Sequence, residues 1–460
     1  MTEKLPNPSD LSALPAYLQT ALCKIGLEAL DMGFASLVAC GREWAERGRR
    51  GEKQRAFAYD PSLLRIGPAH HSKKSRVIVI DVGGTHTKAA LADLDTDGSR
   101  KWQMLFDQNT PTLDRPELKL LPIERFATVL AEKTASALDA VDTVDGIGFV
   151  WSNILFSQRL NTEDSGGVVG VTGVASGIES GKFYRKGEFF AEGLQDGVDI
   201  GAIFLSAMRN QGLKPRAFIM GNDTIFTLKA TPGADGGMVA STGANATAVD
   251  SQGWIYNTEM GGLFPIPDNL LCMGERILLE DRGSQGSIKL EDLIAGRWLP
   301  RVFEGYIVAL WRAGIESLNP LAHHLLEHSC AESPFFTGKD LGVLLEEGRL
   351  QCSKVNDPKF NDLAPLLKQI AQIVAARAGK LAGLMGYLCL LQPLARKEQV
   401  LLSLDSTQAR YLPGYFEAMQ ASLNELAGGA KRAQISLRQP KGAIAVPMEG
   451  LAIALGDELQ

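Results

Sequence analysis

The sequence has 460 residues, of which 45% are hydrophobic and 22% are charged, and its net charge is −6. A chain of this length can build more than one domain, each with its own core. The mixed charges exclude an extended basic surface for nucleic acid. The longest apolar runs are short and interrupted by glycine, which excludes a membrane-spanning helix. We therefore expect a globular protein that has neither a nucleic-acid nor a membrane partner.

The six cysteines stand apart in the sequence, and none forms a CxxC pair or has histidines at zinc-binding spacing. The amino-terminal stretch is polar and proline-rich, without the apolar segment of a signal peptide. Together these features predict reduced thiols and a cytoplasmic protein. The oligomeric state stays open, and a homodimer is one option.

Helices and strands alternate along the chain. A helix is expected over Ser9–Arg42, where leucines recur at helical spacing, and a charged linker follows to about Lys74. The next segments predict strands at Val77–Ile80, Ala89–Leu94 and Trp102–Phe106, a helix at Phe126–Val141, a strand at Ile147–Val150, a helix at Ile200–Gln211, and strands at Arg216–Met220 and Gly236–Ser241. The remainder predicts helices at Leu290–Ala295, Val302–Ala313, Leu341–Leu345, Leu363–Leu391 and Ala443–Leu455, with one strand at Gln399–Leu404. This alternation indicates an α/β protein.

Short apolar strands repeatedly run into turns made of small residues that carry an acid or a hydroxyl. These turns are Asp81–Thr85, Thr242–Asn245, Asp405–Thr407 and the triplet Asn222–Thr224. Glycines let backbone N–H groups approach a polyanion, and threonine hydroxyls donate to phosphate oxygens. An aspartate at a strand end can hold the water shell of Mg²⁺. Together the turns predict a site for a nucleotide and its metal.

Each turn taken singly has a plainer interpretation. A Gly-Gly pair after a strand commonly forms a tight turn, and Asp before Gly is a common turn residue. The triplet that contains Asp223 fits a helix N-cap followed by a hydroxyl. The four turns in one chain, in this order, favour the nucleotide site.

These turns resemble the motifs of the hexokinase family, within the actin-like ATPase superfamily, over roughly Leu63 to the carboxyl terminus. "VIVIDVGGTHTKAAL" is similar to the first phosphate motif of the family, and "ASTGANATA" to the second. "LDSTQARYLPGYFEAM" is similar to the adenosine motif, and "KGAIAVPMEGLAIAL" to the closing helix. The chain looks like a divergent, bacterial-type member.

On the nucleotide side, the resemblance implies that the chain binds ATP and Mg²⁺. Asp81 and Asp223 would hold the metal through water. The residues that match the nucleotide motifs are Asp81, Gly83, Gly84, Thr85, Lys88, Thr242, Gly243, Asp405, Ser406, Thr407 and Lys441.

On the sugar side, the resemblance implies a catalytic base, Asp223, assisted by Lys186. The matching substrate-binding residues are Ser152, Lys186, Asn222, Asp223, Asn245, Glu259 and Glu291. A carboxylate near a sugar hydroxyl accepts its proton as the phosphoryl group departs. Plainer interpretations remain for two of these residues: Glu291 also fits a capping acid at a helix start, and Lys186 also fits an exposed charged turn.

The resemblance further implies an α/β fold of two ribonuclease-H-like lobes with a cleft between them. We expect residues 1–73 to be a helix and linker that pack on the large lobe, and residues 74–220 to form the small lobe. Residues 221–439 would form the large lobe, and residues 440–460 a helix that returns to the small lobe.

The expected function is ATP-dependent phosphorylation of the primary (6-) hydroxyl of a hexose such as glucose. Two alternatives stay open: a kinase for a different sugar or amino sugar, and a non-catalytic sugar sensor. The first is suggested by departures from the family pattern in the sugar-facing loops, at Asn153, Ile154 and Arg185. The second is disfavoured by the acids and threonines kept in the phosphate turns, which a sensor would not need.

Overall fold

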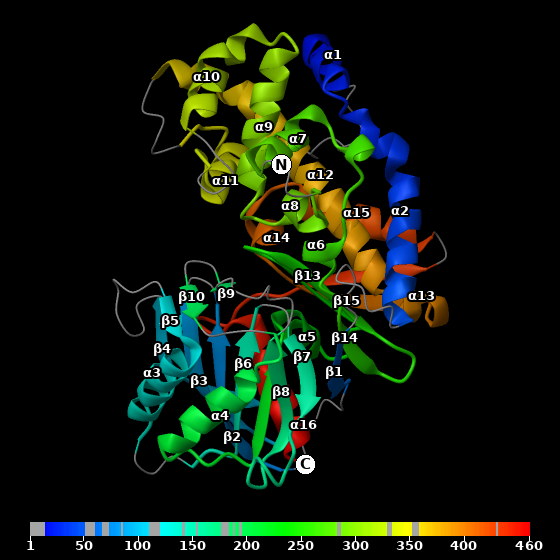
Figure 1. Ribbon diagram of the computed structural model, residues 1–460. Coiled ribbons are helices and arrows are strands. Elements are labelled where there is room, and N and C mark those ends of the chain that lie inside the picture. Colours follow the sequence, from blue (N-terminus) through cyan, green and yellow to red (C-terminus); the bar gives the residue numbers. More distant parts are fainter. Residues whose placement is uncertain are drawn as a thin grey trace.

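The computed structural model covers most of the chain (Figure 1). The residues that it describes are 14–50, 60–66, 73–83, 86–109, 120–139, 143–152, 155–175, 184–186, 189–192, 196–282, 287–328, 334–351, 358–428 and 431–460. Two sheets divide these residues into a small lobe, at the bottom of Figure 1, and a large lobe above it.

The small lobe is built on a seven-stranded sheet with the strand order β4-β3-β2-β6-β11-β8-β7. Its strands are β2 (Ser75–Val82), β3 (His86–Leu94), β4 (Arg100–Asn109), β6 (Gly146–Trp151), β7 (Leu155–Arg159), β8 (Val169–Ala175) and β11 (Ala217–Gly221). Strands β2, β3 and β4 are antiparallel, whereas β2, β6, β11 and β8 run parallel. Helices α3 (Ile123–Ser136) and α4 (Ile200–Asn210) cover one face through a buried aromatic cluster around Phe149 and Phe204. A small sheet of β5 (Leu120–Pro122), β10 (Phe189–Glu192) and β9 (Tyr184–Lys186) completes the lobe.

The large lobe repeats the central plan of the small one. Its sheet has the order β1-β14-β13-β12-β15-β16. The strands are β1 (Asp60–Arg65), β12 (Gly236–Ala240), β13 (Ala244–Val249), β14 (Trp254–Asn257), β15 (Gln399–Ser406) and β16 (Arg432–Leu437). Here too an antiparallel triplet, β12 to β14, is followed by two parallel strands, β15 and β16. Two lobes with one shared sheet plan are the expected ribonuclease-H-like arrangement.

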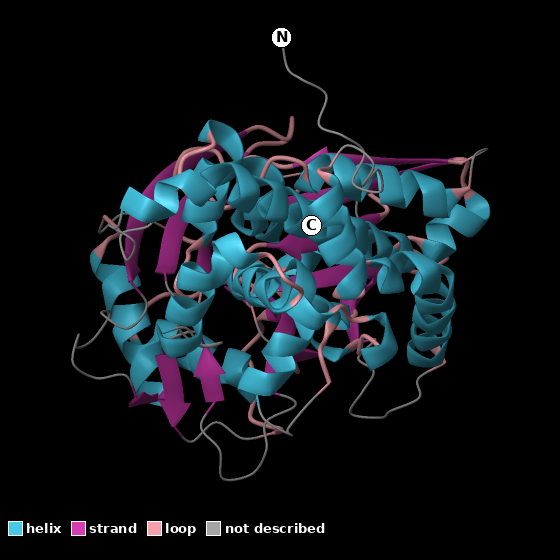
Figure 2. Ribbon diagram, turned by 90° about the horizontal axis from the view of Figure 1, so that it is seen from above, coloured by secondary structure: helices cyan, strands magenta, loops and turns pink. Residues whose placement is uncertain are grey.

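Helices surround the large-lobe sheet (Figure 2). The longest, α12 (Ala364–Cys389), is buried along most of its length and packs on α15 (Tyr415–Ala427). The others are α1 (Ala16–Lys24), α2 (Glu28–Arg49), α6 (Met260–Leu263), α7 (Met273–Arg282), α8 (Leu290–Ile294), α9 (Leu299–Arg312), α10 (Asn319–His328), α11 (Gly338–Glu347), α13 (Leu391–Arg396) and α14 (Thr407–Tyr411). No helix in the described part of the chain is long and apolar enough to cross a membrane.

Two helices lie between the sheets and join the lobes. Helix α16 (Val446–Glu458) packs on β2, β6 and β11 of the small lobe, and α5 (Asp223–Lys229) packs on β12 and β13 of the large lobe. The two helices also pack on each other, so one apolar core contains side chains from both lobes, such as Ile219 and Ile255. Helix α5 begins at Asp223, and its position therefore depends on both sheets.

The packing of α5 on α16 depends on the absence of a side chain at Gly450. A Cβ atom at this position would lie 1.7 Å from the carbonyl oxygen of Phe226 on α5. We therefore expect Gly450→Ala to push the helices apart and to destabilise the protein by about 1–3 kcal/mol, measured by thermal unfolding. Gly338→Ala is the matched control, because a Cβ there meets no atom within 4 Å. Equal melting temperatures for both variants would contradict this account.

Two features of the amino-terminal region differ from the sequence expectation. The single helix expected over Ser9–Arg42 is two helices, because Gly26 takes a left-handed conformation with φ of 79° and ends α1. The N–H of Leu27 then donates to the carbonyl of Leu22 and closes the end of the helix. The linker expected up to Lys74 contains strand β1, which pairs with β14. The lobe boundaries that we expect stay a prediction.

Candidate active site

Three of the expected site residues follow neighbouring strands at one edge of the small-lobe sheet. Asp81 is the penultimate residue of β2, Ser152 follows β6, and Asp223 follows β11. The register pairs Asp81 with Val150 of β6, and Val150 with Gly221 of β11. The register thus places Asp81 level with Gly221, two strand spacings or about 10 Å away, and Asp223 lies two residues further along the chain. Both carboxylates are half-buried, and Ser152 is exposed between them.

The first phosphate turn joins β2 to β3. The N–H of Gly83 donates to the carbonyl of His86 at 2.9 Å, and a Cβ at Gly83 would lie 2.7 Å from that oxygen, so glycine is needed here. Lys88 forms an ion pair of 3.3 Å with Asp107 on β4. Gly84 and Thr85 lie outside the described residues, as do Asn153 and Ile154. Lys186 ends strand β9, and its side chain is likewise outside the description.

Four polar side chains form a closed ring of hydrogen bonds beside Asp223. Asn222 and Asn257 both donate from Nδ2 to Oε1 of Glu259, at 3.5 Å and 2.6 Å. Asn245 donates from Nδ2 to Oδ1 of Asn257 at 2.8 Å and to Oδ1 of Asn222 at 3.4 Å. We call this set the amide ring. Its members come from the start of α5, from β13, from the end of β14 and from the start of α6, so four elements meet at one site.

Glu259, a member of the amide ring, has an unusual backbone conformation. Glu259 has φ of 48° and ψ of 25°, which places it in the left-handed region that non-glycine residues rarely adopt. Such conformations persist where the surrounding structure enforces them, and they occur often at functional sites. The two amide donors hold the side chain of this residue.

Glu291, the other expected sugar-binding carboxylate, lies against the same region. A Cβ atom at Gly243 would come within 3.3 Å of its Oε1, and one at Gly262 within 3.5 Å of its Oε2. Gly243 belongs to the second phosphate turn, and Gly262 to α6, the helix that follows Glu259. The structure therefore places Glu291, on α8, next to two segments that adjoin members of the amide ring.

A pocket of about 830 Å³ in the large lobe contains parts of the other two nucleotide motifs. Thr242, from the turn between β12 and β13, and Thr407, at the start of α14, both line it. The two motifs are joined by a hydrogen bond of 3.1 Å from Thr407 Oγ1 to Ser241 Oγ. The exposed ring of Tyr411 and the cations Arg297, Lys339 and Arg410 also line this pocket. Pockets of this size and mixed lining hold cofactor-sized ligands.

The remaining expected nucleotide residues have partners within the protein. Asp405 forms an ion pair of 2.7 Å with the pocket-lining Arg410. Ser406 is fully buried and caps α14 by accepting from the N–H of Ala409. Lys441 is exposed and pairs with the buried Glu449 of α16 at 3.3 Å. Lys441 is not among the residues that line the pocket.

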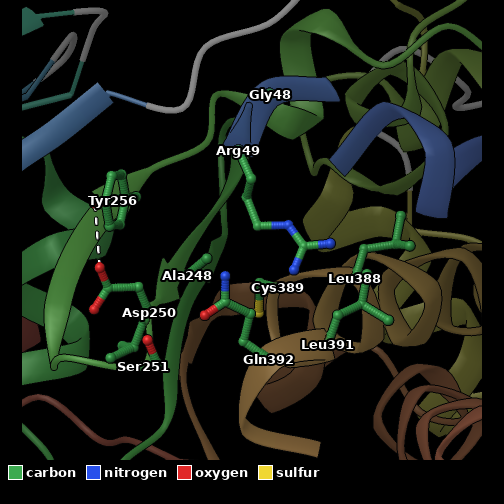
Figure 3. Close-up of a pocket in the computed structure, with 11 residues that line it drawn as sticks. Gly48, Arg49, Ala248, Asp250, Ser251, Tyr256, Leu388, Cys389, Leu391 and Gln392 are labelled. Atoms are coloured by element: carbon green, nitrogen blue, oxygen red, sulfur yellow. Dashed lines mark hydrogen bonds between the residues drawn. The ribbon is translucent and has the colours of Figure 1, made fainter. Parts of the chain in front are cut away.

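A second pocket, of about 340 Å³, lies at the far end of the hairpin that β13 and β14 form (Figure 3). Its walls come from the end of α2, from this hairpin and from α12 and α13, and Arg49 points into it. The hydroxyl of Tyr256 donates to Asp250 across one wall, at 3.2 Å. None of the expected site residues lines this pocket.

The sequence reasoning missed Asn257 as a site residue. It opens the block that contains Glu259, so an amide two residues before an expected sugar-binding acid was a usable signal. No element was predicted from the sequence over the residues of β14. The pairing of its amide with two other site residues depends on the β13–β14 hairpin, which brings Asn245 and Asn257 together.

Comparison with known proteins supports the fold. A scan against models of protein families gives no match, and neither does a search of curated protein sequences. Among solved structures, a hexokinase crystal structure aligns with a TM-score of 0.69 over 96% of this chain and 99% of its own, at 17% identity. The hexokinase from Schistosoma mansoni, solved in complex with glucose, aligns with a TM-score of 0.69 over 96% of this chain and 100% of its own, also at 17% identity. The fold prediction is confirmed: this chain has the two-lobed α/β fold of the hexokinases.

Proposed function

We propose that this protein is a member of the hexokinase family that transfers the γ-phosphoryl group of ATP to the 6-hydroxyl of a hexose such as glucose. The observation that carries the proposal is the amide ring, which lies next to Asp223 and contains three of the expected sugar-binding residues. A polyol is best bound by amides and carboxylates, which can accept and donate hydrogen bonds to its hydroxyls. The Schistosoma mansoni hexokinase of the same fold was solved with glucose.

In this proposal Asp223 is the general base. It is the first residue of α5, and Asn222 caps that helix by accepting from the N–H of Thr224 at 3.0 Å. The cap fixes the direction in which the chain leaves β11 and thereby where the Asp223 carboxylate lies. A carboxylate in hydrogen-bond reach of the 6-hydroxyl accepts its proton as the oxygen attacks phosphorus. Glu259, Glu291 and Asn245 would hold the other hydroxyls of the sugar.

The large-lobe pocket would bind ATP. Thr242 and Thr407 can donate to phosphate oxygens, while Tyr411 offers an exposed ring on which the adenine base can stack. Arg297 and Lys339 add positive charge to the pocket walls. Asp405 acts on the nucleotide only through Arg410, which it holds in place.

The donor set at the edge of the small-lobe sheet fits Mg²⁺. Asp81 and Asp223 supply hard carboxylate oxygens from rigid strand ends, and their separation leaves room for a cation that keeps most of its water ligands. When bound with ATP, Mg²⁺ would neutralise charge on the phosphate oxygens. Ser152 and Lys186 would contact the sugar from the small lobe when the lobes close, and closure would exclude water from the reacting groups.

A sugar panel tests this proposal. ADP release from ATP and Mg²⁺ is measured with glucose, mannose, fructose, glucosamine and N-acetylglucosamine, and we expect at least one hexose to raise it well above the sugar-free rate. A change in melting temperature with sugar, without any ADP release, would contradict the kinase proposal and favour a sensor. ADP release only with an amino sugar would contradict the expected substrate.

A further inference from the structure

We propose that Asn257 is a positioning residue, and that it sets how the sugar site distinguishes one hydroxyl from another. The inference rests on the proposed sugar site and goes beyond it, because the family resemblance assigned no role to this residue. Asn257 is buried and lies at the end of β14, where it pairs with Thr247 on one side and Asp60 on the other. Its backbone is therefore fixed by two neighbouring strands.

The amide ring has only one consistent arrangement of donors and acceptors. An ionised carboxylate can only accept hydrogen bonds, so the amides that contact Glu259 must turn their NH₂ groups towards it. Asn257 then presents Oδ1 to Asn245, which must answer with its own NH₂ group at 2.8 Å. The Oδ1 atom of Asn245 is left to accept from the N–H of Ala246, at 2.7 Å. Glu259 thus determines the orientation of Asn245 through Asn257, without touching it.

Glu259 also determines the orientation of the Asn222 amide. Its NH₂ group faces Glu259, so its Oδ1 atom accepts from Asn245 and from both the N–H and the hydroxyl of Thr224. The cap of α5, which carries Asp223, is therefore part of the same network. Asn257 and Asn222 are the two ring members that link Glu259 to Asn245. Of the two, Asn257 makes the shorter contact to Glu259, at 2.6 Å.

In this arrangement the amide ring holds the Glu259 carboxylate in place for a sugar hydroxyl. Asn257 and Asn222 both donate to Oε1 of Glu259, and these two contacts fix the position of the carboxylate. A sugar hydroxyl that donates to Glu259 then meets an oxygen held in one place. Loss of the Asn257 amide would release both Glu259 and Asn245, so the site would tolerate a sugar that lacks this hydroxyl.

The test is a comparison of binding ratios. The dissociation constants of glucose and of 2-, 3- and 4-deoxyglucose are measured by calorimetry for the wild type, and Glu259→Gln identifies the hydroxyl whose loss Glu259 detects. For that hydroxyl we expect the ratio of the dissociation constant of the deoxyglucose to that of glucose to be about 10 to 100 in the wild type. Asn257→Ala and Asn257→Asp should both reduce this ratio to about threefold or less. Their ratios at the other hydroxyls should stay near those of the wild type.

Asn257→Asp separates positioning from packing. It keeps the size of the side chain and an acceptor for Asn245, but it removes the donor to Glu259. A residue that merely fills space would tolerate this change, so a wild-type ratio in a folded Asn257→Asp or Asn257→Ala protein overturns the inference. Asn269→Ala, at an exposed position, is the control and should keep every ratio. If the wild type binds neither glucose nor any other hexose of the panel, the proposed function fails, and the inference fails with it.

Discussion

Asp223→Asn should reduce the turnover of the best sugar about 10²- to 10⁴-fold, while the dissociation constant of that sugar changes by less than about threefold. General bases contribute rate factors of this order, and the amide that replaces the carboxylate cannot accept the proton of the attacking hydroxyl. Asparagine has the same shape and keeps Asp223's place at the start of α5. The measurements are steady-state ADP release and calorimetric sugar binding.

A matched control shows that the effect belongs to this position. Asp97→Asn removes one carboxylate from an exposed turn between β3 and β4 and should leave turnover unchanged. Turnover of the Asp223→Asn protein within tenfold of the wild type would exclude Asp223 as the base. Equal losses of turnover and of sugar affinity would instead indicate that Asp223 only binds the substrate.

Arg377→Ala should destabilise the protein by about 3–5 kcal/mol, because it leaves a buried carboxylate without its counter-ion. Arg377 lies within α12 and forms a bidentate pair with Glu275 of α7, with one N···O distance of 2.8 Å. Burial by itself would lower the pKa of the guanidinium, but Glu275 raises this pKa well above its ordinary value, so the arginine stays charged. The midpoint of chemical unfolding measures the loss.

The same arginine also holds the amino-terminal helices. It donates to the carbonyl of Leu27, between α1 and α2, and to that of Leu270, just before α7. Arg276→Ala is the control, because Arg276 is exposed next to Glu275 on α7, and its removal should cost less than about 1 kcal/mol. The double variant Glu275→Gln with Arg377→Met removes both charges and should recover part of the stability. An Arg377→Ala protein as stable as Arg276→Ala would contradict the account.

The sequence predicted the elements with strong periodicity and missed those that depend on distant partners. The segment Asp60–Arg65 begins with Asp-Pro and shows no clear alternation, so it gave no strand signal. It becomes a strand because β14, far along the chain, offers a free edge for pairing. The break at Gly26 was readable, since a glycine that follows a lysine in the last helical turn is a common helix end.

The prediction of site residues was also limited by contacts between segments that are distant in the sequence. The motifs identified Asn245 and Glu259 one at a time, but the link between them runs through Asn257, whose role depends on the pairing of β13 with β14. Lys441 was assigned to the nucleotide because of its motif. Its pairing with Glu449 could not be predicted, because it depends on how the turn before α16 folds back. The roles of these residues in binding and catalysis stay predictions until the variants are measured.

The position of α16 has a consequence for biosynthesis. The strands that it covers are translated early, whereas α16 is among the last segments to leave the ribosome. During synthesis one face of the small-lobe sheet, with the side chains of Val77, Val79 and Ile219, therefore has no permanent cover. A nascent chain in this state would be a natural client for chaperones that hold apolar surfaces. Premature termination before Val446 would leave this state permanent, and such a fragment should aggregate rather than fold as a smaller protein.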